Sequence, residues 1–85
     1  MTDELLEQVK RMAKTAERAL TFASVQARTP MATVTRGCFI KQLWHAGRLA
    51  AMLRDGEDFK DEFYEMEIAA KAAIRALSHL RGQVA

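Results

Sequence analysis

The sequence predicts an all-α fold, a three-helix antiparallel bundle with long first and third helices that dimerisation completes. Two observations lead to this prediction. Apolar residues recur at alternating steps of four and three in three long segments, which is the spacing of one face of a helix. Turn-forming pairs, Thr29-Pro30 and Asp55-Gly56, separate these segments, and strand-like alternation is absent from the sequence. The 85 residues are therefore expected to form a single helical domain over 1–85.

The first helix is expected over residues 3–28. We call a set of apolar residues on one side of a helix a seam. The seam of this helix contains Leu5, Val9, Met12, Ala16, Ala19 and Ala23, widened on one flank by Leu6, Ala13 and Leu20. Proline disfavours helical geometry in the residue before it, so Thr29-Pro30 ends the helix.

The second helix is expected over residues 35–54. An earlier start at Pro30, with Thr29 as the cap, is the alternative, but residues 33–35 and Gly37 are weak helix formers and favour the later one. Two seams follow on adjoining faces. The first contains Phe39, Leu43, Ala46, Ala50 and Leu53, and the second contains Ile40, Trp44, Gly47 and Ala51. Two seams require two packing neighbours, either both other helices or one helix and a partner molecule.

The third helix is expected over residues 58–81. Asp58 is suited to cap its start, Gly56 to close the preceding helix in the left-handed conformation, and Gly82 to end the chain's last helix. Its seam contains Phe59, Phe63, Met66, Ala70, Ala73, Leu77 and Leu80. Because alanine buries little area, the alanine-rich seams predict a thin core with apolar surface left for a second subunit.

Composition limits the class of protein. The sequence is 49% hydrophobic and 28% charged, which is ordinary for a folded chain and argues against general disorder. Its single cysteine, Cys38, excludes an intramolecular disulfide and suits a reducing compartment, with an intermolecular bridge through Cys38 as the alternative. The N-terminus is acidic where a signal peptide would be basic, and no apolar run approaches the ~20 residues of a membrane span. A cytoplasmic location without membrane association is therefore expected.

The leading candidate site is an interaction surface on the second and third helices. Tryptophan is enriched among interface anchors because it contributes a large apolar area with few rotors. The predicted partner-binding residues are Ile40, Trp44, Gly47, Ala51, Tyr64 and Ile68. Burial of Trp44 inside the three-helix core is the alternative. The sequence thus predicts a small regulatory protein, a homodimer that binds an unidentified protein through helix packing and inhibits or stabilises it.

A second interpretation is a dimeric nucleic-acid-binding protein. Its phosphate contacts would come from basic residues on the first two helices: Lys10, Arg11, Lys14, Arg18, Lys41 and Arg48. Residues 31–54 contain four basic and no acidic residues, whereas residues 55–85 contain seven acidic and four basic ones. This asymmetry equally suits two helices that match each other's charge within the molecule.

Metal binding and catalysis find little support in the sequence. Cys38, His45 and His79 do not follow the spacing of a zinc site. The carboxylates of Glu62, Glu65 and Glu67 have a structural reason to lie near a helix start, and no nucleophile–base pair or phosphate-binding loop is recognisable. No catalytic residue, metal ligand or cofactor is therefore predicted, and the protein is not expected to be an enzyme.

Overall fold

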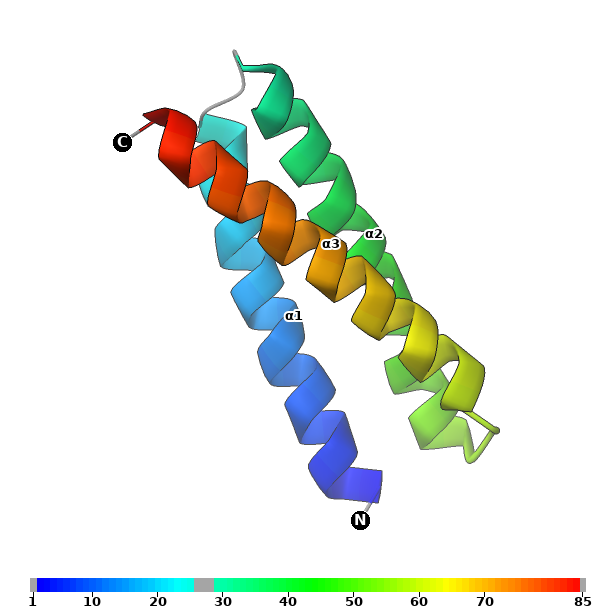
Figure 1. Ribbon diagram of the computed structural model, residues 1–85. Helices are drawn as coiled ribbons and strands as arrows, with labels where there is room; N and C mark the ends of the chain where they lie inside the picture. The colour runs from blue at the N-terminus through cyan, green and yellow to red at the C-terminus, as the bar shows by residue number, and fades with distance from the viewer. Residues whose placement is uncertain (1, 26–28, 85) are drawn as a thin grey trace.

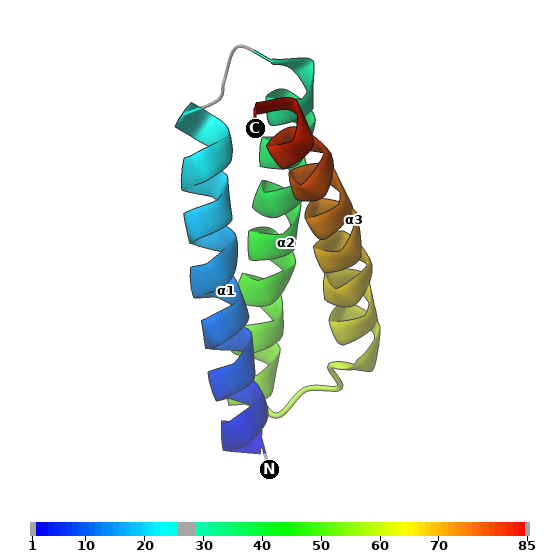
Figure 2. The same ribbon diagram turned by 60° about the vertical axis from the view of Figure 1, so that its left-hand side comes forward.

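The computed structural model describes residues 2–25 and 29–84, and every element in these ranges is an α-helix. The elements are α1 (Thr2–Val25), α2 (Pro30–Asp55) and α3 (Lys60–Val84). They pack side by side into an elongated molecule of 42 × 19 × 15 Å (Figures 1 and 2). The predicted all-α, three-helix architecture is confirmed. Within the described residues, no helix is both long and apolar enough to cross a membrane.

The helix α2 is the central element. It packs along both α1 and α3, whereas α1 and α3 contact each other little. The core consists of three clusters along α2, and each cluster takes buried residues from all three helices. They are centred on Val9, Leu49 and Met66, on Ala16, Phe39 and Ala73, and on Ala23, Ala32 and Leu80. Two of the three clusters are built largely from alanine, so the core is thin there, as the sequence indicated.

The start of α2 corrects the prediction, because the helix begins at Pro30 and not at residue 35. Thr29 has extended geometry, and its hydroxyl accepts a hydrogen bond from the Ala32 N–H at 3.1 Å. Proline at the first helical position loses nothing, since an N–H there has no partner within the helix. The Thr35 hydroxyl donates to the Met31 carbonyl at 2.7 Å and is buried. This N-cap outweighs the weak helix propensity of the residues that follow.

The other boundaries agree in part. Gly56 ends α2 in the left-handed conformation with φ 72°, as predicted. The Asp58 carboxylate accepts a hydrogen bond from the Lys60 N–H at 3.2 Å, but α3 begins at Lys60, two residues later than expected. The prediction that Gly82 caps α3 is wrong, because the helix continues to Val84. The last predicted residues of the first helix, 26–28, lie outside the described residues.

The buried faces of α2 and α3 are rotated from the predicted seams. On α2 the buried residues are Ala32, Thr35, Phe39, Gln42, His45, Ala46, Leu49 and Leu53, so that Leu43 and Ala50 are half-buried flanks. On α3 the buried line runs through Glu62, Met66, Ala69, Ala73, Ala76 and Leu80; Ala70 of the predicted seam is also buried, and Phe63 and Leu77 are half-buried flanks. The cause is that polar residues occupy core-facing positions, which a count of apolar residues leaves out. The seam of α1 is confirmed, with Val9, Ala16 and Ala23 buried at its centre.

Candidate interaction surface

Trp44 lies on the outer face of α2. It stands two residues from Gln42 and from Ala46, which are both buried, so its side chain leaves the opposite side of the helix. Trp44 is 57% exposed and Ile40 is 52% exposed, while Gly47 is exposed and Ala51 half-buried. The alternative that Trp44 belongs to the core is therefore wrong for the single chain. The second predicted seam of α2 is solvent-facing.

The two predicted residues of α3 are also exposed, but they point in different directions. Tyr64 stands two residues from the buried Glu62 and Met66, so it faces away from the core and from α2. Ile68 lies closer to α2, because it lines a cavity of about 180 Å³ together with Cys38, Lys41 and Glu65. Within one chain, Trp44 and Tyr64 thus do not form a continuous patch.

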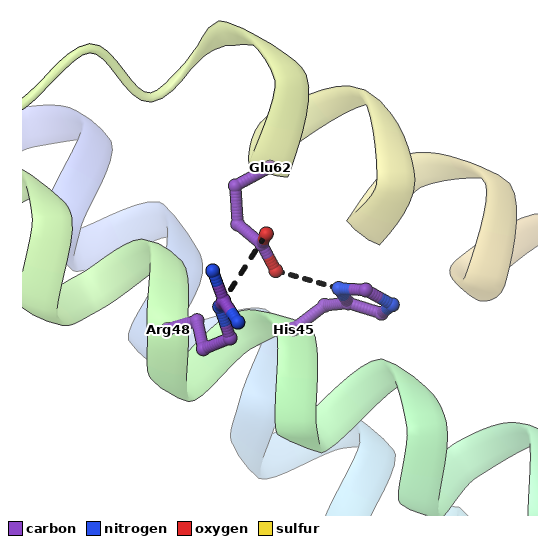
Figure 3. A network of polar contacts seen from close by, with 3 residues as sticks. All are labelled: His45, Arg48 and Glu62. Atoms are coloured by element: carbon purple, nitrogen blue, oxygen red, sulfur yellow. Dashed lines mark hydrogen bonds and ion pairs between the residues drawn. The ribbon is translucent and has the colours of Figure 1, made fainter.

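A polar network joins α2 to α3 beside Trp44 (Figure 3). The His45 Nδ1 and Glu62 Oε1 atoms are 2.6 Å apart, and both side chains are only 10% exposed. The Arg48 Nε lies 3.6 Å from the other carboxylate oxygen of Glu62. A buried carboxylate requires such partners, because an unpaired charge away from water is costly.

The same network orders the Trp44 ring. The Arg48 guanidinium carbon lies 4.9 Å from the ring centroid, which is a cation–π geometry. The His45 ring meets the indole edge-on, with centroids 5.0 Å apart and planes at 80°. Trp44 is thus largely exposed and yet held between two neighbours.

The His45–Glu62 pair bridges α2 and α3. The pair resembles a base with an orienting carboxylate, and the second ring nitrogen of His45 points away from Glu62 (Figure 3). Among the described residues, however, His45 makes its only hydrogen bond to Glu62, and no three His, Cys, Asp or Glu side chains converge as metal ligands.

The predicted nucleic-acid residues are exposed but lie on different faces. Lys14 and Arg18 each stand two residues from the buried Ala16, so they point away from α2. Arg48 instead reaches Glu62 on α3. Lys10 is paired with Glu7 at 3.6 Å, while Arg11 lines a different cavity and Lys41 lines the one beside Ile68. The basic residues of α1 and α2 are thus not brought together.

Gln42 is a polar core residue that the sequence reasoning missed. It lines a cavity of about 270 Å³ between α1 and α3, with Arg11 and Ile74 at the sides and Phe39 beneath. Gln42 is only 6% exposed, and its Oε1 atom has no hydrogen-bond partner among the described residues. The missed signal was the seven-residue repeat of Thr35, Gln42 and Leu49, which is a helix face regardless of polarity.

Comparison with known proteins gives no match: no protein-family model, no curated protein and no solved structure is significantly similar to the chain.

Proposed function

We propose that this protein is a small, non-enzymatic regulatory module that forms a homodimer and binds another protein through helix packing, which it inhibits or stabilises. In this proposal the three helices form an antiparallel bundle that a second copy completes, and the protein acts in the cytoplasm without a cofactor. The observation that supports it best is the exposed and ordered Trp44 on the outer face of α2.

An exposed tryptophan with fixed neighbours is well suited to binding. Its large apolar area becomes favourable when a partner removes it from water, and Ile40 one turn away adds to the same face. Because Arg48 and His45 already restrict the ring, little side-chain entropy is lost when a partner docks. The cations Lys41 and Arg48 flank this face, so a partner with an acidic border fits it best.

Light scattering coupled to size exclusion, over a range of concentrations, tests this proposal. The Trp44→Ala variant is expected to lose self-association and to retain its helical circular dichroism, because the ring lies outside the core. Ile74→Ala is a matched control, since Ile74 is 63% exposed on α3 but lies at the cavity between α1 and α3. A Trp44→Ala variant that unfolds, or that associates like the native chain, would overturn the role of Trp44.

Nucleic-acid binding is the second candidate function, and the exposed α1 stripe of Lys10, Arg11, Lys14 and Arg18 is the observation that favours it. Binding through several phosphates weakens steeply with salt. Retardation of duplex DNA or of RNA at low salt, lost in Lys14→Glu, would support this function. Absence of retardation at low salt would remove it.

A further inference from the structure

The boundary between α2 and α3 presents a basic strip beside an acidic one. On α2, Lys41, Trp44 and Arg48 recur at steps of three and four and so share one helix face. On α3, Asp61, Glu65 and Ile68 do the same. All six residues are exposed, and the cavity lined by Lys41, Glu65 and Ile68 shows that the two strips adjoin. We call these six residues the seam surface, which is a boundary between two helices and is distinct from the apolar seams defined above.

We propose that a second copy of this chain docks on the seam surface, about a two-fold axis that runs along the boundary between α2 and α3. This inference rests on the proposed function, since it names the face through which the homodimer forms. Such an axis places α2 of each copy on α3 of the other, so basic strips meet acidic strips. A two-fold axis across the helices would instead stack α2 on α2 and bring the bases together.

Under this symmetry, the charged residues that face each other lie at the same height along the helix axes. The hydrogen bond between His45 and Glu62 marks one level on the two helices, and Lys41 and Glu65 line one cavity at the next. An axis parallel to the helices preserves these levels. Lys41 of each copy therefore faces Glu65 of the other, and Arg48 faces the acidic start of α3, where Asp61 lies. Neither Lys41 nor Glu65 has an ion pair in the described part of the chain, so both are available.

The apolar residues of the seam surface match as well. Trp44 is 57% exposed and Ile68 is 46% exposed, and docking covers both. Trp44 reaches α3 of the other copy near the level of Tyr64, so the symmetry joins residues that lie apart within one chain. Small side chains, Ala69 and Ala72, leave room in the 180 Å³ cavity for an apolar side chain of the other copy. Ile40 lies on the same exposed face of α2 as Trp44 and so borders this contact.

Charge reversal tests the two-fold contact directly. Lys41→Glu gives a chain with an acidic residue at both position 41 and position 65, and Glu65→Lys gives a chain with a basic residue at both. Each variant alone is expected to dimerise about tenfold more weakly than the native chain, because two like-charged contacts form in each dimer. An equal mixture is expected to regain native dimerisation, since both contacts of the mixed dimer join an acid to a base. Sedimentation equilibrium measures these dissociation constants.

Controls separate the contact from folding and from net charge. Lys71→Glu changes the net charge by the same amount as Lys41→Glu, at an exposed α3 position outside the seam surface, and is expected to dimerise normally. If either single variant loses helicity by circular dichroism, the double variant Lys41→Glu/Glu65→Lys replaces it. That chain restores opposite charges both within and between copies, and it must dimerise.

The outcomes distinguish this inference from the proposed function. A native chain that is monomeric at every concentration overturns both the seam contact and the homodimer. A native dimer whose charge-reversal variants dimerise equally well leaves the homodimer intact but places it on another face. A mixture that stays monomeric, or a double variant that does, overturns the seam contact as well.

Discussion

At the scale of single residues, the His45–Glu62 contact at 2.6 Å is shorter than the Arg48–Glu62 contact that also joins α2 to α3. We expect Glu62→Ala to lower the free energy of unfolding by about 2–3 kcal/mol, because it removes a short, buried, charge-assisted hydrogen bond and leaves His45 without its partner. Urea unfolding followed by circular dichroism measures the change. Glu67→Ala, at an exposed position on α3, is the control and is expected to change stability by less than about 0.5 kcal/mol. Equal effects of the two substitutions would show that the contact does not stabilise the fold.

Gln42 is expected to destabilise the fold, because its buried Oε1 has no hydrogen-bond partner in the described part of the chain. We expect Gln42→Met to raise the free energy of unfolding by about 1 kcal/mol, since methionine has a similar length and removes the desolvated amide. The same unfolding experiment measures it, with Gln8→Met on the exposed side of α1 as the control. A loss of stability in Gln42→Met would mean that the amide is satisfied in solution, for instance by water in the cavity between α1 and α3.

At the scale of helices, Gly47 weakens α2. It lies in the middle of the helix and it is exposed. A Cβ atom added there meets nothing within 4 Å apart from its chain neighbours and the backbone of its own helix. We therefore expect Gly47→Ala to stabilise the protein by about 1 kcal/mol. Gly56→Ala is the contrast, because Gly56 has φ 72° and a side chain there costs about 1 kcal/mol or more. Thermal unfolding monitored by circular dichroism compares the two. Destabilisation by Gly47→Ala would contradict the open surroundings of this glycine.

Apolar periodicity located all three helices, because a repeat of three and four residues is long and regular in each. It could not predict which face of α2 and of α3 is buried, because Gln42 and Glu62 are polar residues at buried positions. It also misplaced the start of α2, where the side chain of Thr29 and the fixed geometry of Pro30 outweigh propensity. The exposed face of Trp44 was found, but its contacts with Arg48 and His45 depend on side-chain packing that no spacing rule contains.

At the scale of the whole molecule, charge is arranged by face. The net charge of +2 is small, the α1 stripe points outward, and the bases of α2 lie beside the acids of α3. An arrangement that alternates in sign across one boundary favours a complementary protein surface over a uniform phosphate backbone. The charge distribution and the exposed apolar residues at the boundary between α2 and α3 therefore both favour a protein partner over a nucleic acid.

The thin core ties stability to association. Alanine supplies most of the buried side chains in two of the three core clusters, so the single chain gains little from burial there. In the proposed homodimer, a second copy would add buried area that the monomer lacks. For a homodimer, mass action then makes the melting temperature depend on concentration. We expect a hundredfold increase in protein concentration to raise the Tm of the native chain by roughly 5–10 °C. Lys41→Glu is expected to show a much smaller rise over the same range, because its dimer is weaker. A Tm that is independent of concentration in the native chain would mean that the three helices are stable alone, and it would contradict the homodimer.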